Sequence, residues 1–303
     1  LSVGRSGVNI VTLFGSPQIS LILWEVRLPR TLLALITGAV LGASGAIMQG
    51  WLRNPLADPG VLGVSSSAAV GSVAAIYFGA SGVVWLTPLA GIAGALLGFY
   101  LLLQLIGRET GILLIILAGA ALNAFCGAIT ALLLNLAPNP FAVQDMLFWL
   151  MGSFANRSQL HILLVIPPVI IGSILLWRAT RSLDVLALGE QTATTLGVDH
   201  RRLFYYVGAG TAMVVGACVA VAGVIGFVGL VVPHLLRPLV AWQPRALVLP
   251  SALAGALLLL VADMGVRLLP AGPELKIGVV TALIGGPFFL YILRHVRKAE
   301  GLL

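Results

Sequence analysis

The residues that could do chemistry in this chain are few, and their spacing does not suit catalysis. Its two lysines, Lys276 and Lys298, lie in no GxxxxGK[ST] loop, so the chain lacks the loop that cradles nucleotide phosphates. No HExxH motif and no GxSxG serine elbow occurs. The four histidines are scattered without metal-ligand spacing: His161, His200, His234 and His295. We therefore expect no catalytic residue, no bound metal, and no ATP hydrolysis by this chain alone.

Acidic groups that could relay protons through a membrane are also scarce. Asp263 is the only acid well inside a predicted span, and it lies near the outer end of that span. Proton-coupled carriers usually need such groups. The scarcity of such acids counts against a gradient-driven secondary transporter or channel, which stays the alternative function. For an intramembrane enzyme, the sequence offers no nucleophile paired with a base. Cys126 and Cys218 fall in different apolar spans, where they are expected to pack as small residues.

The elements that carry these residues are long apolar runs. Of the 303 residues, 59% are hydrophobic and 9% are charged. A helix needs roughly 20 apolar residues to cross a bilayer core. We predict an all-α integral membrane bundle forming one transmembrane domain over residues 1–303. Nine spans are visible: Leu28 to Gly50, Val61 to Gly79, Val83 to Ile106, Gly111 to Leu136, His161 to Trp177, Leu203 to Gly223, Ile225 to Val240, Ala246 to Val266 and Ile277 to Leu293.

The basic residues predict the orientation, because Lys and Arg near helix ends resist translocation. A cytoplasmic C-terminus places the larger group inside: Arg53, Arg108, Arg178, Arg181, Arg201, Arg202, Arg237, Arg245, Arg294, Arg297 and Lys298. The smaller group then lies outside: Arg5, Arg27, Arg30, Arg157, Arg267 and Lys276. Because the chain opens with Leu1, we expect a missing first helix that would bring the count to ten. The net charge of +7 reflects these topology signals and contacts with membrane lipids, with no nucleic-acid partner.

Small residues recur inside the spans, as at Gly38, Gly42 and Gly45. In lipid, such positions let helix backbones approach closely, because packing drives the association of helices. We therefore expect closely packed helices in a single bundle.

Three local patterns stand out from this apolar background. The first joins Arg27-Leu28-Pro29-Arg30-Thr31 to the later run from Gln49 to Gly60, which contains Arg53-Asn54-Pro55-Leu56-Ala57-Asp58-Pro59-Gly60. The second is the polar insertion from Leu186 to Gly197. The third is the run from Gly226 to Arg237, with Pro233-His234 near its end.

In this order and spacing, the three patterns resemble the permease subunits of type II ABC importers, the FecCD family that carries ferric siderophores, haem and vitamin B12. The similarity covers the chain from Leu1 to Lys298, and the family normally has ten helices. The resemblance implies a homodimer in the bacterial inner membrane, with the translocation path at its two-fold axis. It also implies two cytoplasmic ATPase subunits that hold ATP and Mg, and a periplasmic substrate-binding protein. No cofactor is expected on this chain itself.

The resemblance also implies roles for single residues at the two membrane faces. A cytoplasmic coupling-helix segment at 186–200 would seat on the ATPase through Gly189, Glu190, Ala193, Thr194, Leu196 and Gly197. Outside, Arg27, Arg30 and Arg267 match arginines that meet acidic residues of the binding protein. The alternatives are a surface helix with no partner and arginines that only anchor helix ends to headgroups.

The resemblance also assigns roles to residues near the translocation path. Asn54 and Leu56 match a cytoplasmic constriction, although an ordinary Asx turn would also explain Asn54. Two residues of a second constriction, Ile112 and Leu113, replace small hydroxyl residues of the vitamin B12 permease, which disfavours a corrinoid. The pore candidates are Met48 and Gln49. Residues 53–60 resemble the haem and siderophore members of the family most. This resemblance favours haem as cargo, then a ferric siderophore, ahead of corrinoids and molybdate-type oxyanions.

Overall fold

The computed structural model describes residues 21–79, 82–107, 111–268 and 274–299, without the side chains of 293 and 295–299. The expected additional N-terminal helix, Arg108, and the side chains of His295 and Lys298 lie outside what is described. Within the described ranges, every regular element is a helix. In chain order these are the π-helical turn Leu23–Arg27, α2 (Leu28–Trp51), the 3-10 turn Pro59–Leu62, α3 (Val64–Tyr77), α4 (Leu86–Ile106), α5 (Ile112–Asn135), α6 (Pro140–Leu150), α7 (Gln159–Leu186), α8 (Glu190–Thr195), α9 (His200–Ala222), α10 (Val228–Leu236), the 3-10 turn Arg237–Val240, α11 (Pro244–Leu268) and α12 (Ile277–Ala299).

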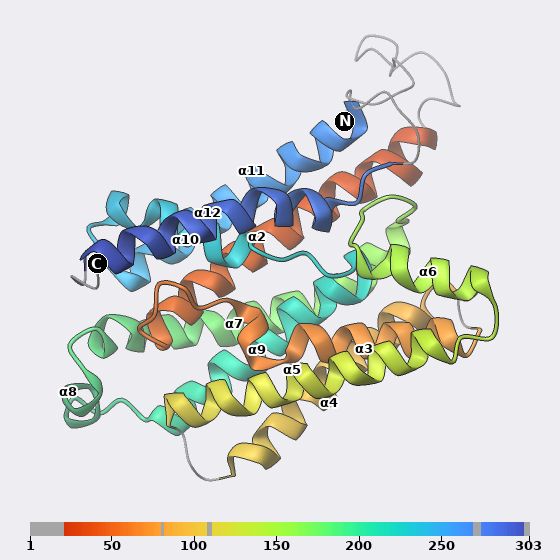
Figure 1. The fold of residues 1–303 in the computed structure, drawn as a ribbon. Coiled ribbons are helices and arrows are strands. Elements are labelled where there is room, and N and C mark those ends of the chain that lie inside the picture. The colour runs from red at the N-terminus through yellow and green to blue at the C-terminus, as the bar shows by residue number, and fades with distance from the viewer. Residues whose placement is uncertain (1–20, 80–81, 108–110, 269–273, 300–303) are drawn as a thin grey trace.

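Each of the nine predicted spans corresponds to an apolar helix. Six are long and apolar enough to cross a membrane: α2, α4, α5, α7, α9 and α11. Three are shorter apolar helices: α3, α10 with its following turn, and α12. Figure 1 shows them side by side in one bundle, with α8 and the C-terminal end of α12 toward the same end. The predicted all-α membrane bundle is confirmed.

Helix α2 runs through the interior of the bundle, where its glycines meet the backbone of other helices. A Cβ atom placed on Gly38 would lie 2.2 Å from the carbonyl oxygen of Gly255 in α11. On Gly45 it would lie 1.9 Å from the carbonyl oxygen of Gly229 in α10. Any side chain at these positions would push the helices apart, so the small residues permit the packing as predicted.

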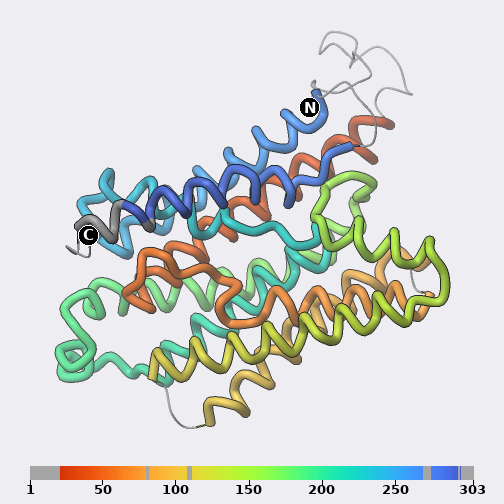
Figure 2. The backbone as a smooth tube through the Cα atoms, viewed as in Figure 1, coloured from red at the N-terminus to blue at the C-terminus, as the bar shows by residue number. Residues whose placement is uncertain are grey.

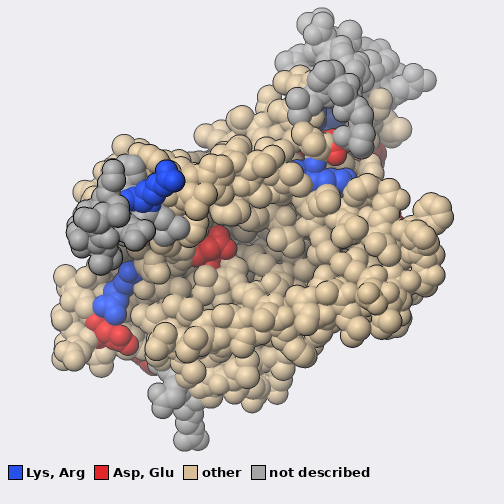
Figure 3. Space-filling view, viewed as in Figure 1, with Lys and Arg blue, Asp and Glu red and all other residues tan. Residues whose placement is uncertain are grey.

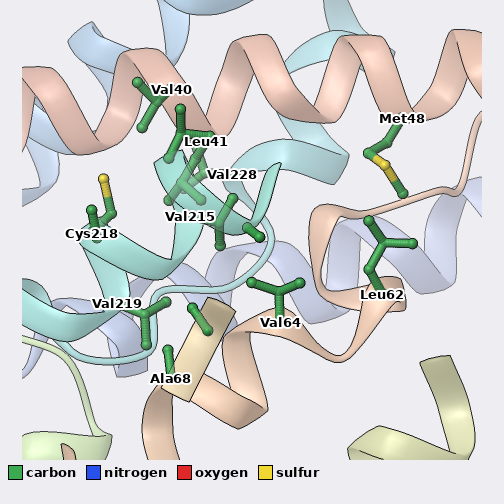
Figure 4. Packing of buried hydrophobic residues seen from close by; sticks show 14 of the residues in the cluster. Val40, Leu41, Met48, Leu62, Val64, Ala68, Val215, Cys218, Val219 and Val228 are labelled. Atoms are coloured by element: carbon green, nitrogen blue, oxygen red, sulfur yellow. The ribbon is translucent and has the colours of Figure 1, made fainter. Parts of the chain in front are cut away.

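Two predicted spans are broken helices. The chain from residue 52 to residue 63 doubles back before α3 begins (Figure 2), and Gly63 adopts a φ of 76° at that junction. Similarly, Gly223 leaves α9 with a φ of 75°, and a non-helical segment precedes α10. In Figure 4, Leu62 lies opposite Met48 of α2, and Val64 lies on the side of Val215 of α9. Non-helical backbone is tolerated at membrane depth only where protein covers it, and here buried side chains do so.

Two further differences correct the sequence prediction. Residues 140–150 form helix α6, although the sequence analysis assigned no element there. The Asn139 side chain caps the helix by accepting from the amide of Ala142 at 2.8 Å, and Pro140 occupies its first position. Helix α7 continues past Trp177 to Leu186, because charged residues end an apolar span without ending the helix itself.

The surface matches a membrane protein. Figure 3 shows a face that is mostly uncharged, with the basic side chains gathered toward the ends of the bundle. Below, the "α8 end" denotes the end with α8, the 52–58 loop and the start of α5. The "Arg30 end" denotes the end with Arg30, Asp263, the 151–158 loop and the start of α12.

Candidate functional site

Helix α8 is a short helix held between two glycines with positive φ. Gly189 at its N-cap has a φ of 110°, and Gly197 after it has a φ of 86°. Glycine adopts such backbone at little cost, which explains both residues. The Thr194 hydroxyl lies 2.9 Å from Nε2 of His200, so the helix is tied to the start of α9. The predicted coupling segment is therefore a defined helix joined closely to its neighbours.

One face of α8 packs inward, and the residues that flank it point out. Ala193 is fully buried, whereas Leu188 and Leu196 are 65% and 62% exposed. Leu188 and Leu196 are thus large apolar side chains exposed beside a polar helix, and contact of this surface with an ATPase stays a prediction. The geometry suits a small helix that docks as a rigid unit.

The loop after α2 carries the predicted constriction residues. The Asn54 side chain accepts from the amide of Leu56 at 2.9 Å, which is the Asx turn considered from the sequence. Arg53, which follows the C-cap of α2, has a φ of 48°, and the backbone amide of Asn54 donates to the carbonyl of Gln49 at 3.2 Å. The loop is thus closed by local hydrogen bonds. Its constriction role stays a prediction.

The α8 segment and this loop touch through one ion pair. A guanidinium nitrogen of Arg53 lies 3.5 Å from the Glu190 carboxylate. A small crevice beside the pair is also lined by Ile112, the first residue of α5. Its neighbour Leu113 points away and is exposed. The structure therefore brings Ile112, but not Leu113, next to the coupling segment.

At the Arg30 end, the buried acid Asp263 lies between two of the predicted docking arginines. Arg30 donates to Asp263 from Nε at 2.9 Å and from Nη2 at 2.8 Å, and it also contacts Glu274. Arg267 donates to the other oxygen of Asp263, one helical turn away in α11. The carboxylate of Asp263 is 0% exposed, so its charge is matched entirely within the chain. Such a pairing positions the guanidinium groups by packing and hydrogen bonding together.

The third docking arginine, Arg27, is also buried, at the turn that leads into α2. Its carbonyl oxygen accepts from the Thr31 hydroxyl at 2.8 Å. The structure thus brings Arg30 and Arg267 to one carboxylate and keeps Arg27 nearby in the chain. Contact of any of them with a binding protein stays a prediction.

The pore candidates, Met48 and Gln49, are both buried within the chain. The Gln49 amide donates to the carbonyl of Leu230 at 3.1 Å, and its oxygen accepts from Arg237 at 2.6 Å. Gln49 thus joins α2 to α10 and to Arg237, and a pore-lining role for Met48 and Gln49 stays a prediction.

Some partners were missed from the sequence. Glu274 and Arg237 had no predicted contact, yet each completes a buried polar group on α2. Arg237 lies 188 positions from Gln49, so no local spacing links them. In the sequence, the only sign of these contacts was that Glu274 and Arg237 each lie at the edge of an apolar run.

Comparisons with known proteins agree with this architecture. The model of the FecCD transport family matches residues 1–295. A vitamin B12 import system permease, BtuC of Shigella boydii serotype 18, is 39% identical over 98% of this chain and 91% of its own length. BtuC of Escherichia coli O157:H7 is 41% identical over 92% of this chain and 85% of its own length. A solved structure described as an inward-facing metal-chelate type ABC transporter has a TM-score of 0.88 and 33% identity, covering 97% of this chain and 94% of that chain.

Proposed function

The chain belongs to the FecCD transport family, and from that premise we propose that it imports a corrinoid-type metal chelate. Membership makes it a permease subunit of an ABC importer, a multi-pass protein of the bacterial inner membrane. ATPase activity in this family lies in a separate subunit. Family membership does not identify the cargo, which is therefore what we propose.

The whole-length similarity to vitamin B12 permeases carries the proposed cargo. Two such relatives share 39% and 41% identity with this chain over more than nine-tenths of it. The similar solved structure is described only as a metal-chelate transporter, which agrees with a corrinoid and with other chelates. The comparisons therefore favour a corrinoid over the haem expected from residues 53–60, despite the apolar Ile112 and Leu113.

We further propose the assembly in which the permease works. Two copies of the chain enclose the path, two ATPase subunits bind ATP and Mg on the cytoplasmic side, and a substrate-binding protein docks outside. The exposed Leu188 and Leu196 beside α8 support an ATPase contact at the α8 end. Nucleotide-driven movement of the ATPases would then reach the bundle through α8 as a rigid body.

The docking proposal assigns Arg30, Arg267 and Arg27 to acidic residues of the binding protein. Guanidinium groups bind carboxylates with two parallel hydrogen bonds, and Asp263 and Glu274 already occupy part of this capacity. Docking would bring carboxylates of the binding protein to guanidinium groups whose orientation Asp263 and Glu274 already fix. At the opposite face, we propose that Asn54, Leu56 and Ile112 narrow the path, because the loop and the start of α5 lie next to α8.

The decisive experiment is uptake into proteoliposomes that contain the permease, its ATPase and its binding protein. Cyanocobalamin, haem and a ferric siderophore are supplied in parallel, each with MgATP and with a nonhydrolysable analogue. Uptake of cyanocobalamin that needs hydrolysis supports the proposal. ATP-dependent uptake of only haem or only the siderophore would overturn the cargo, and uptake that responds to an ion gradient without ATP would overturn the importer mechanism.

A further inference from the structure

A cavity of about 440 Å³ at the Arg30 end has no role in the proposals above. It lies among the starts of α4, α7 and α12, helix α6, and the 151–158 loop. Its polar lining residues include Asp145, Arg157, His161 and Lys276. None of these belongs to the Asp263 ion-pair group.

Arg157 is a cation without a carboxylate partner among the residues that the structure describes. Its Nε is shielded from solvent and has no hydrogen-bond partner there. None of the ion pairs within the described ranges includes it, even though Asp145 lines the same cavity. Burial lowers the pKa of the guanidinium to about 10, so the group stays charged at neutral pH. A shielded cation without an anion is costly, and a bound anion removes that cost.

A second cation faces the same space. The ammonium group of Lys276 lies 5.0 Å from the ring centre of Phe148, which is a cation–π contact, and no carboxylate pairs with it in the described part of the chain. The imidazole Nδ1 of His161 accepts from the amide of Ser158 at 3.1 Å, which leaves Nε2 as the N–H donor. The cavity therefore carries two cations and a neutral donor against one exposed carboxylate.

Most of the other lining residues are apolar, and Thr87, Ser153 and Asn156 add polar groups. The apolar ones are Ile76, Val83, Val84, Pro88, Phe148, Trp149, Ala155 and Ala220. The volume far exceeds that of one water molecule, whose share of liquid volume is about 30 Å³. A ligand that fills the cavity must combine an acidic group with an apolar body.

We propose that this cavity binds an amphipathic anion. Its carboxylate or phosphate lies between Arg157 and Lys276, and its apolar part lies against Val83, Val84 and Phe148. Two sources offer this chemistry: an acidic group of the transported chelate and the headgroup of a phospholipid in the outer leaflet. The proposal does not depend on which cargo is carried.

The test measures binding of dodecyl phosphate to the purified permease–ATPase complex in a neutral detergent, with dodecyl maltoside as the uncharged probe. We expect Arg157→Gln to weaken binding of dodecyl phosphate by about tenfold, Lys276→Gln to weaken it less, and Arg157→Lys to retain most of it, because ion-paired hydrogen bonds supply the recognition. Arg178→Gln, an exposed arginine in α7 outside the cavity, is the matched control and should bind as the unmodified complex does.

Folding is checked for each variant by circular dichroism and by retention of the ATPase. Equal binding of dodecyl phosphate by folded Arg157→Gln and Lys276→Gln would overturn the proposal. So would no binding to the unmodified complex, or binding of dodecyl maltoside with the same affinity as dodecyl phosphate.

Competition then identifies the source of the anion. Displacement of dodecyl phosphate by cyanocobalamin, which contains a phosphodiester, but not by cobinamide, which lacks it, supports the cargo as the source. Phosphatidylglycerol that copurifies with the unmodified complex and is lost from Arg157→Gln in native mass spectra supports the lipid. Failure of cyanocobalamin, haem and phosphatidylglycerol alike to displace the probe would count against a physiological ligand and overturn the assignment.

Discussion

At the Arg30 end, Asp263 lies fully buried between Arg30 and Arg267, whereas at the α8 end Glu190 reaches only Arg53, at 3.5 Å. The side chains of Arg53 and Glu190 are 39% and 50% exposed. A charge pair in water contributes little stability, while a buried charge depends strongly on its partners. The charges of the Asp263 ion-pair group, formed by Arg30, Arg267, Asp263 and Glu274, are therefore balanced within the chain.

Exposed apolar side chains occur at both ends, as Leu275 does at the Arg30 end. At the α8 end, Leu188 and Leu196 flank the short polar helix α8, where we propose that the ATPase binds. We therefore expect the Arg30 end to depend on contacts within the chain, and the α8 end to depend on the proposed contact with the ATPase. Substitutions at the Arg30 end should consequently impair folding, and substitutions at the α8 end should impair association with the ATPase.

The largest effect is expected for Asp263→Ala. It leaves Arg30 and Arg267 without their shared carboxylate, and removing one partner of a buried pair costs about 3–5 kcal/mol. We expect loss of folded protein, measured as the yield of monodisperse permease and its thermal denaturation midpoint in detergent. The control Asp263→Asn keeps the shape and should lose less. A stable Asp263→Ala protein would show that the arginines do not need the carboxylate.

Leu196→Asp should abolish association with the ATPase and leave the fold intact. The change places a charge on an exposed apolar surface where the ATPase is proposed to bind. The measurement is copurification of the ATPase with the tagged permease. Leu275→Asp, which alters an exposed leucine at the Arg30 end, should retain the ATPase. Equal retention by both variants would remove the proposed coupling role of α8.

A smaller effect is expected for Asn54→Ala. It removes the acceptor of the Leu56 amide, a hydrogen bond whose net contribution is about 1 kcal/mol. We expect faster labelling of a cysteine introduced at Leu56 by a water-soluble maleimide, because the loop opens more often. Asn54→Asp, which keeps an acceptor, should label at the original rate. An unchanged rate in Asn54→Ala would mean that the turn does not hold the loop.

The smallest effect on stability is expected for the Arg53–Glu190 pair. Reversing both charges, as Arg53→Glu with Glu190→Arg, should change the free energy of unfolding by less than about 0.5 kcal/mol, because the pair is exposed. Thermal denaturation of the double variant tests this expectation. A large loss would show that the α8 end depends on its ion pair as the Arg30 end does.

Local sequence was sufficient for the spans and for α8. Each of the nine apolar runs contains a helix, and six of these helices are long and apolar enough to cross a bilayer. Gly189 and Gly197 correctly bracketed α8, since their positive φ values are local properties of the backbone. Helix α6 was missed because it is short, although the cap at Asn139 and Pro140 was visible in the sequence.

The sequence by itself determined the membrane class, the apolar runs that become helices, the glycines that allow close packing and the position of α8. Only the tertiary structure decided that α3 and α10 begin inside the protein, and that Arg30 pairs with Asp263, 233 positions away. The physical reason is that hydrophobicity and backbone preference act locally along the chain. Ion pairs, buried hydrogen bonds and cavities such as the one around Arg157 arise between segments that only packing brings together.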